Sequence, residues 1–333
     1  MARDDSTPFH LNAWGEGVEA ATGHAFKRYG LKDQAGALVA IMPVHFIRSI
    51  LFGKAAASAG FAVDGGILAD SADVANALAE AVWALPEVQA SGSLELRGGI
   101  MPGGEAWHIK SETYAGFSTP LAADDDAQLL AVPRKQRAEI RKALTGVVEG
   151  QYGYVTGNDD ALAAEHYAIY AESVRNLGTP VFPKKLFDEI RRRFGKDCDI
   201  LTVKTTSGTP LASVLSLYHK GTVMPYWGGG TWEARAARAN ELMYYMLMCH
   251  ARTRGCTRFD FGRSKVGTGA YAYKKNWGME PQALTYAVRT ASGEEPRDIN
   301  PLSPKYQKKI EMWQKLPLWV ANRVGPFIAR GLG

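Results

Sequence analysis

The stretch DILTVKTTSGTPLASVLSLYHKGTVMPYW, residues 199–227, decides the fold of this chain. It contains three runs of strand-forming residues, and a short connection with a glycine separates each run from the next. The runs are 199–205, 210–218 and 222–227, and the connections are Ser207-Gly208 and Lys220-Gly221. Short glycine-containing connections between such runs are typical of β-hairpins. We therefore predict an antiparallel meander of three strands.

Helical patterns flank this meander on both sides. Two helices are expected before it, at 159–176 and 183–195, where Asn158 and Pro183 provide start signals and glycines provide stop signals. After it we expect a helix, a strand, a short helix and a last strand, at 240–254, 258–261, 269–277 and 283–288. The order α-α-β-β-β-α-β-α-β predicts an α+β or α/β layered domain, in which helices pack on a sheet.

The first half of the chain also mixes helix and strand signals. Helices are expected at 9–22 and 70–85, strands at 38–52 and 93–97, and a loop at 60–66. The run of aspartates at 124–126 indicates a boundary, and a helix follows Pro133. Because 333 residues at roughly 150 per domain suggest two domains, we divide the chain near this point.

Composition and charge exclude several classes of protein. With 46% hydrophobic and 22% charged residues, the chain has the composition of an ordinary folded protein. Residues 297–333 carry seven lysines and arginines against two acids, and 7 − 2 = +5 equals the whole net charge. The remaining body is neutral, which argues against a nucleic-acid-binding surface over the whole body.

Localisation and metal content are predicted from what the sequence lacks. The N-terminal residues have no apolar run of the secretory type, and charged side chains interrupt the most apolar stretch, 35–63. The three cysteines show no Cys-x-x-Cys spacing, and the seven histidines show no His-x-x-x-His spacing. We expect a cytoplasmic protein in a reducing compartment, without a metal site.

Five longer sequence segments resemble one protein family. They are SVRNLGTPVFPKKLF (173–187), RFDFGRS (258–264), YAYKKNWG (271–278), RKQRAEIRKA (134–143) and NPLSPKY (300–306). Together they are similar to the FemAB family of the GNAT superfamily, and most similar to its branch associated with exosortase and PEP-CTERM protein sorting. The resemblance covers essentially the whole chain.

The resemblance implies two tandem GNAT-like acyltransferase domains with a C-terminal helical tail. We divide the chain into an N-terminal GNAT-like domain (1–130), a basic connecting helix (131–148), a C-terminal catalytic GNAT-like domain (149–295) and a basic amphipathic tail (296–333). The implied activity is an N-acyltransferase that forms an amide on a cell-envelope acceptor, such as a peptidoglycan precursor or an exopolysaccharide-related amine. Aminoacyl-tRNA or acyl-CoA would be the co-substrate, with no tightly bound cofactor.

The sequence departs from the acyl-CoA pattern at residues 228–239. Acyl-CoA enzymes carry Gln/Arg-x-x-Gly-x-Gly/Ala here for the pyrophosphate, but this chain has GGGTWEARAARA. Two alternatives to the FemAB-like function remain open. One is a CoA-dependent N-acetyltransferase, and the other is a non-catalytic GNAT scaffold of a polysaccharide-export or protein-sorting system.

Three residues are the catalytic candidates. The resemblance implies that Lys274 lies at the reaction centre, where a buried ammonium would stabilise the tetrahedral oxyanion. In the alternative, Lys274 and Lys275 are a solvated pair on a helix without a catalytic role. Arg263 would grip a phosphate or carboxylate, or instead form a salt bridge to Asp260 or Glu241. Asp260 would act as a general base or orient Arg263 or Lys274.

A wider set of residues is expected to bind substrates. Arg134, Arg137 and Arg141 of this set fall within a ~60° arc of the helix expected after Pro133. They would contact acceptor phosphates or the tRNA backbone, unless they form a solvated face. The aromatic members would stack on a base or sugar, unless they are core residues. The set is Arg134, Arg137, Arg141, Tyr226, Trp227, Asn240, Tyr271, Tyr273, Lys275 and Trp277.

The tail interleaves basic with aromatic and aliphatic residues. Pro317, Gly325 and Pro326 interrupt it, so two short helices are expected between 305 and 332. Mixed basic and apolar segments suit an interfacial helix, which predicts peripheral contact with the inner membrane through 297–333. In the alternative, these side chains pack back onto the second domain.

Overall fold

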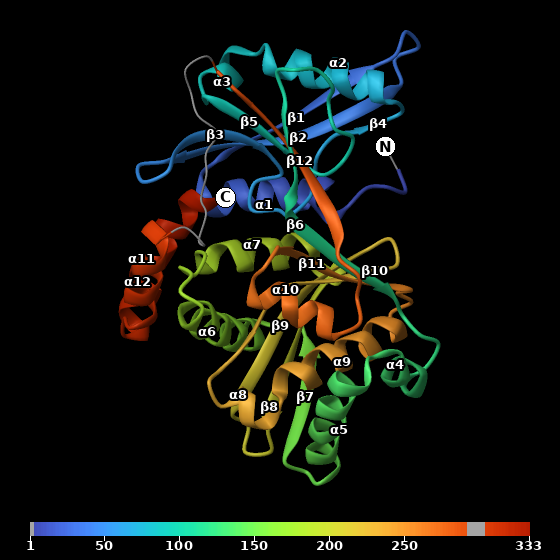
Figure 1. Ribbon diagram of the computed structural model, residues 1–333, viewed down its shortest axis with the longest axis vertical. Helices are drawn as coiled ribbons and strands as arrows, with labels where there is room; N and C mark the ends of the chain where they lie inside the picture. Colours follow the sequence, from blue (N-terminus) through green and yellow to red (C-terminus); the bar gives the residue numbers. More distant parts are fainter. Residues whose placement is uncertain (1–2, 292–303) are drawn as a thin grey trace.

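The computed structural model describes residues 3–291 and 304–333. Its strands form one continuous twelve-stranded sheet in the order β1-β2-β3-β5-β12-β6-β11-β10-β9-β8-β7, with β4 paired to β2 (Figure 1). The strand bounds are β1 Ala25–Lys32, β2 Leu38–Ser49, β3 Gly53–Ser58, β4 Leu68–Ala69, β5 Ser93–Arg97, β6 His108–Pro120, β7 Tyr152–Gly157, β8 Cys198–Thr205, β9 Pro210–His219, β10 Thr222–Gly230, β11 Arg258–Lys265 and β12 Gln282–Thr290.

Helices cover both sides of this sheet (Figure 1). In the first half they are α1 Asn12–Thr22, α2 Ala72–Trp83, α3 Pro86–Gln89, α4 Asp125–Ala131 and α5 Arg134–Val148. In the second half they are α6 Asp160–Asn176, α7 Lys184–Phe194, α8 Ala234–Ala237, α9 Ala239–Thr253, α10 Gly269–Asn276, α11 Pro304–Gln314 and α12 Leu318–Ala329. Short 3₁₀ turns lie at Pro8–His10, Gly195–Asp197 and Arg330–Leu332.

The predicted meander is confirmed as β8, β9 and β10, which pair antiparallel in sequence order. The expected order of helices and strands after it is also confirmed, with the short α8 as an addition before α9. These elements follow from local signals. The side chain of Asp159 caps α6 by accepting from the Leu162 amide, and Gly208 and Gly221 adopt the left-handed conformation that their hairpin turns require.

The sheet consists of two similar arms that meet at the β6–β12 pair. In one arm β12 pairs with β5, β5 runs parallel to β3, and β3, β2 and β1 continue antiparallel. In the other arm β6 pairs with β11, β11 runs parallel to β10, and β9 and β8 continue antiparallel. Apart from β7, which pairs with β8 and extends the second arm by one strand, the two arms have the same arrangement, as expected for tandem GNAT-like domains.

The last strand of each half pairs with the other half. β6 follows β5 in the chain but pairs with β11, whereas β12 follows β11 but pairs with β5. The two arms therefore do not coincide with continuous ranges of sequence, and the division into 1–130 and 149–295 stays a prediction. The expected connecting helix corresponds to α5, and the predicted boundary at residue 296 lies outside the described residues.

A buried aromatic cluster joins the N-terminal helix to the second arm. Trp14 of α1 is fully buried against Phe9, Tyr226 and Trp227, with ring centroids 4.8, 5.2 and 5.9 Å away. Its indole Nε1 donates to the Gly60 carbonyl at 3.0 Å. Trp14 therefore connects the second arm to the loop that follows β3.

We expect Trp14→Ala to lower the free energy of unfolding by ~3–5 kcal/mol, because it leaves a cavity and an unpaired carbonyl. Urea unfolding followed by circular dichroism measures this loss, and the continuous sheet predicts a single transition. Trp232→Ala is the matched control, since that side chain is 63% exposed, and its effect should stay within ~0.5 kcal/mol. Equal losses in the two variants would contradict the proposed role of the cluster.

Candidate active site

The candidate site lies where β10 and β11 separate. Within residues 3–291 and 304–333 they pair only at Thr222–Arg258 and Val223–Phe259, and from there to Gly230 the strand partner of β10 is β9. A bulge in β10 between Pro225 and Trp227 increases the divergence. The separation leaves one edge of β10 open beside β11 and the helix that follows it, α10.

Lys274 of α10 points back to β11. Its Nζ donates to the Arg263 carbonyl at 2.9 Å and lies 5.3 and 5.7 Å from the ring centroids of Phe261 and Phe117. Burial lowers the pKa of Lys274 from its ordinary value of 10.5 to about 7, although the Asp260 carboxylate opposes this shift. Lys274 is thus a largely enclosed amine that changes charge near neutral pH, whereas Lys275 is exposed.

Asp260 and Arg263 reach the site because β11 contains a bulge. The register against β6 shifts between Asp260 and Gly262, and Gly262 adopts φ 71°, a conformation that glycine tolerates. The Gly262 amide donates to Asp260 Oδ1 at 2.8 Å, but burial outweighs this bond and raises the pKa of Asp260. Asp260 is therefore easier to protonate than an ordinary aspartate.

Arg263 is held by tyrosines. Its Nη1 donates to the Tyr286 hydroxyl at 2.7 Å, and its guanidinium lies 4.4 Å from the centroid of the Tyr114 ring. Within the described residues Arg263 forms neither of the two salt bridges considered for it, to Asp260 or Glu241. The remaining guanidinium donors are the groups that a substrate carboxylate or phosphate would use.

The 59–66 loop forms the opposite wall of the site. Three consecutive carbonyls accept hydrogen bonds from three different strands: Phe61 from Tyr226 at 2.6 Å, Ala62 from Arg97 at 3.0 Å and Val63 from Tyr286 at 2.8 Å. Ala59 and Phe61 have positive φ angles of 47° and 63°. Such conformations persist only where the surroundings fix them.

This loop brings a second carboxylate to the site. Asp64 is partly buried, and burial raises its pKa although the Gly65 amide donates to Oδ1 at 2.6 Å. Its charge also contributes to the raised pKa of Asp260, so the two carboxylates lie near one another. On β5 Glu95 pairs with Arg97 at 2.6 Å. The positive charges of Arg97 and Arg263 help to hold the pKa of Glu95 below its ordinary value, against the effect of burial.

Several of these residues were not identified from the sequence: Asp64, Glu95, Arg97, Tyr114 and Tyr286. A signal existed for two of them. Glu95 and Arg97 alternate with the buried Leu94 and Leu96, so both had to lie on the other side of β5. The remaining three had no such signal, because their contacts come from distant parts of the chain.

The structure corrects the stacking role expected for two tryptophans. Trp227 and Trp277 are each 3% exposed. Trp227 packs against Phe187 at 4.4 Å, and Trp277 packs among Tyr244, Phe261 and Tyr273 at 6.1–6.4 Å. The two rings are core residues, which was the alternative to stacking, because their side chains point from β10 and from the end of α10 into the interior. Tyr226 uses its hydroxyl to hold Phe61 in place.

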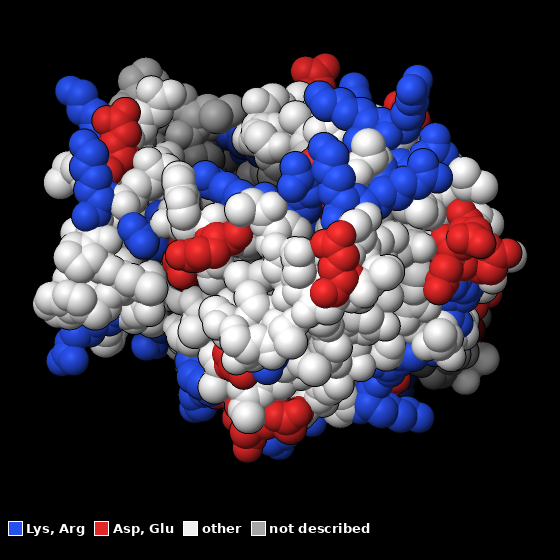
Figure 2. Space-filling view, turned by 90° about the horizontal axis from the view of Figure 1, so that it is seen from below, with Lys and Arg blue, Asp and Glu red and all other residues white. Residues whose placement is uncertain are grey.

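The other predicted binding residues lie around the site or away from it. Tyr271 packs edge-on against Phe117 at 5.3 Å, close to Lys274, and Asn240 lies over Gly230 at the end of β10. Arg134 and Arg141 are exposed on α5, and Arg137 donates to the Leu130 carbonyl at 3.1 Å. Lys and Arg side chains gather in a band at the end of the molecule that carries α5 (Figure 2).

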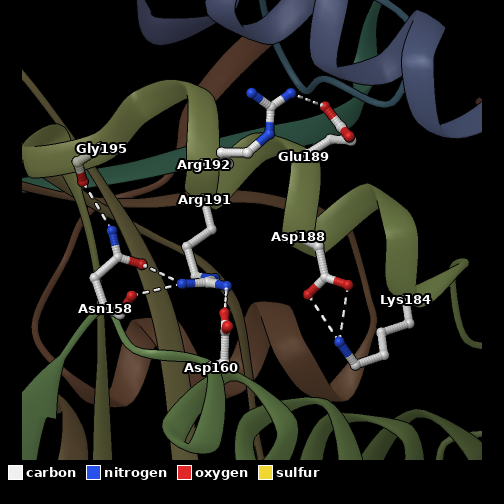
Figure 3. Close-up of a pocket in the computed structure, with 8 residues that line it drawn as sticks. All are labelled: Asn158, Asp160, Lys184, Asp188, Glu189, Arg191, Arg192 and Gly195. Atoms are coloured by element: carbon white, nitrogen blue, oxygen red, sulfur yellow. Dashed lines mark hydrogen bonds and ion pairs between the residues drawn. The ribbon is translucent and has the colours of Figure 1, made fainter.

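Two surface cavities lie away from Lys274. A cavity of about 710 Å³ opens between α6 and α7 (Figure 3), where Lys184 pairs with Asp188 at 2.8 Å and Arg191 pairs with Asp160. Its charged groups already neutralise one another. A second cavity, of about 450 Å³, adjoins Trp232 and Arg235, and the Arg235 guanidinium lies 4.2 Å from the Trp232 ring centroid.

The lowered pKa of Lys274 makes a prediction about stability. Between pH 7 and 10 the unfolded chain holds a proton on this lysine that the folded chain has lost, so stability should rise with pH over this range. Replacing Lys274 by Met should remove that rise. Urea unfolding at several pH values measures it, and Lys204→Met is the control, since Lys204 is 23% exposed and paired with Glu165. Identical pH profiles for wild type and Lys274→Met would contradict the shift.

Comparisons with known proteins agree with this architecture. A sequence-family model described as an acetyltransferase (GNAT) domain matches residues 134–275. No match was found among curated proteins. Within residues 3–291 and 304–333 there is no helix long and apolar enough to cross a membrane, and no group of acidic, His and Cys side chains that could hold a metal ion.

Solved structures share the fold over nearly the whole chain. The crystal structure of FemX is similar with a TM-score of 0.67 at 15% identity, covering 86% of this chain and 93% of that one. A tandem GNAT protein from the clavulanic acid biosynthesis pathway gives 0.55 at 12%, covering 86% and 89%. The C-terminal domain of a putative lysylphosphatidylglycerol synthetase from Agrobacterium fabrum gives 0.52 at 11%, covering 83% and 93%. The chain therefore contains a GNAT acetyltransferase-type domain and has the fold of tandem GNAT proteins.

Proposed function

We propose that this protein is a FemAB-like N-acyltransferase that forms an amide bond on an amine of a cell-envelope acceptor. The observation that carries the proposal is the enclosed Lys274 amine beside Asp260, at the place where β10 and β11 separate in a GNAT-type fold. The open edge of β10 would receive the acyl donor. The carbonyl of the bound acyl donor would then lie beside α10.

The proposed reaction is aminolysis of an activated acyl group. The acceptor nitrogen attacks the acyl carbon, a C–N bond forms, and the C–O or C–S bond to the donor breaks. The proton lost by the nitrogen ends on the leaving oxygen or sulfur. In its charged form Lys274 would donate to the developing oxyanion, and such a donor is worth about 10²–10³ in rate. The carboxylates of Asp260 and Asp64 would accept the proton of the amine in transit.

Two observations favour aminoacyl-tRNA or another activated acyl group over acyl-CoA as donor. The loop between β10 and α9 carries no glycine-rich pyrophosphate pattern. Five of its eight backbone amides are also occupied: Thr231 donates to Leu211, Trp232 to the Glu172 carboxylate, and Arg235, Ala236 and Arg238 to carbonyls of the loop itself. Free amides at such a loop are what a phosphate would need. The names of FemX and lysylphosphatidylglycerol synthetase, borne by fold neighbours, agree with aminoacyl transfer.

The CoA-dependent N-acetyltransferase is the second candidate. The match of residues 134–275 to the acetyltransferase family favours it. The acceptor stays open between a peptidoglycan precursor and an exopolysaccharide-related amine, and the association with exosortase and PEP-CTERM sorting stays a prediction. The α5 arginines are proposed to contact phosphates of the acceptor or of tRNA.

Lys274→Ala should lower turnover about a hundredfold or more while changing the melting temperature little, because the lost interaction forms mainly in the transition state. The acceptor can be sought by mass spectrometry of envelope lipids and peptides from a deletion strain, and turnover then measured on it. Because the ammonium is the proposed form, wild-type activity should fall as pH rises above about 7. Lys204→Ala serves as the control. Parallel losses of activity and melting temperature in Lys274→Ala would indicate a structural lysine.

Acetyl-CoA should bind weakly or not at all, because the 231–238 loop lacks the pyrophosphate-binding pattern and five of its eight amides are already paired. Isothermal titration calorimetry of the purified chain with acetyl-CoA tests this directly. A dissociation constant in the micromolar range would favour the acetyltransferase over the FemAB-like function.

A further inference from the structure

One edge of the molecule exposes large apolar side chains. On α12 Trp319 is 72% and Phe327 80% exposed, and at the tip of the β2–β3 hairpin Ile50 and Leu51 are 105% and 65% exposed. In Figure 1 this hairpin and the helices α11 and α12 project from the same side of the molecule. Contiguous apolar patches of this kind on soluble proteins mark interaction surfaces.

The helix α12 buries three small residues and exposes its two aromatic residues. Ala321, Gly325 and Ala329 are buried, and a Cβ on Gly325 would approach the Val181 amide nitrogen to 3.1 Å. Positions two residues away lie on the opposite side of a helix, and they hold Trp319, Arg323 and Phe327. A helix that only packs on the body of its own protein would be expected to bury its aromatic residues instead.

The tail is fixed to the body in this orientation. Arg175 of α6 donates to the Gln314 carbonyl at 3.1 Å, and the Gln314 amide donates to the Asn176 carbonyl at 3.1 Å. At its other end His24 Nε2 lies 2.8 Å from the Arg330 carbonyl, and Gly331 packs on Ser49 at the hairpin. The exposed residues of α12 and the hairpin tip therefore belong to one edge.

Basic side chains surround this apolar edge. Arg48 and Lys54 flank the hairpin tip. Arg323 lies between Trp319 and Phe327 on α12, and Arg330 directly follows the helix; all four cations are exposed. Within the described ranges 3–291 and 304–333, none of these four forms an ion pair. Glu311 is the one acidic side chain between residues 307 and 333. The edge thus combines apolar residues with a local excess of positive charge.

We propose that this edge, formed by the β2–β3 hairpin tip and α12, docks the protein on the surface of an anionic lipid bilayer. Aromatic and aliphatic side chains would enter the headgroup region while the arginines and lysines contact lipid phosphates. A second copy fits this edge less well. In a twofold contact the patch meets the same patch of the other copy, so two surfaces with an excess of positive charge would face each other.

The docking edge is close to the candidate site. Gly333 packs against the Phe61 ring, and the Phe61 carbonyl accepts from Tyr226 in the 59–66 loop. The loop that lines the site would therefore lie near the headgroups of a docked protein. Vesicle binding is measured without any acyl substrate, so its outcome is independent of the proposed reaction.

Co-sedimentation of the full chain with vesicles tests the proposal. The chain should bind vesicles of equimolar phosphatidylglycerol and phosphatidylcholine, bind less at high salt, and bind pure phosphatidylcholine weakly. The triple variant Ile50→Ser/Trp319→Ser/Phe327→Ser should lower the partition coefficient at least about tenfold. Arg323→Gln/Arg330→Gln should lower it about 25-fold on anionic vesicles, given about fivefold for each cation at ~1 kcal/mol.

The control is Leu130→Ser/Val148→Ser, which removes two side chains that are 62% and 88% exposed on α4 and α5. It should bind vesicles like wild type, and circular dichroism should show all variants folded. Absence of vesicle binding by the intact chain, or equal binding by all variants, would overturn the proposal. So would analytical ultracentrifugation that shows a dimer dissociated by the triple variant without vesicle binding, since the edge would then join two copies.

Discussion

The exchange of the last strands between the two arms is the constraint on which the other features depend. Because β6 is hydrogen-bonded to β11 and β12 to β5, neither arm can complete its sheet without the chain of the other. The exchange also fixes the distance between the 59–66 loop and α10. Without it, Tyr286 of β12 could not bind both Arg263 and the Val63 carbonyl.

The two arms share one arrangement but use it differently. In each arm a parallel pairing of only two residues joins a meander to the next strand, Ala56–Leu94 and Ala57–Glu95 in the first and Thr222–Arg258 and Val223–Phe259 in the second. Beyond this pairing the first arm continues into the 59–66 loop, whose carbonyls are occupied by Tyr226, Arg97 and Tyr286. The second arm keeps its edge open, which is why the candidate site lies there.

The polar groups of the site are kept partly buried and incompletely paired. Glu95 and Arg97 form an ion pair, whereas Arg263 donates one hydrogen bond to a tyrosine hydroxyl and lies over an aromatic ring. In the part of the chain that the structure describes, Asp64, Asp260 and Lys274 form hydrogen bonds to backbone groups alone. Burial shifts the pKa of each in the direction that favours the neutral form. Titratable groups shifted in this way are typical of functional sites.

The sequence alone determined the local elements, because hairpin turns, helix caps and hydrophobic spacing act within a few residues. The meander of β8 to β10, the helix-strand order after it and the two tail helices were all predictable on this basis. The segments that resemble the FemAB family also identified Lys274, Asp260 and Arg263 as candidates. Tertiary structure alone decided the strand exchange, the burial of Trp227 and Trp277, and the arrival of Asp64 and Tyr286, since Tyr286 meets a partner 223 residues away. Such contacts depend on the packing of whole arms, which no local pattern encodes.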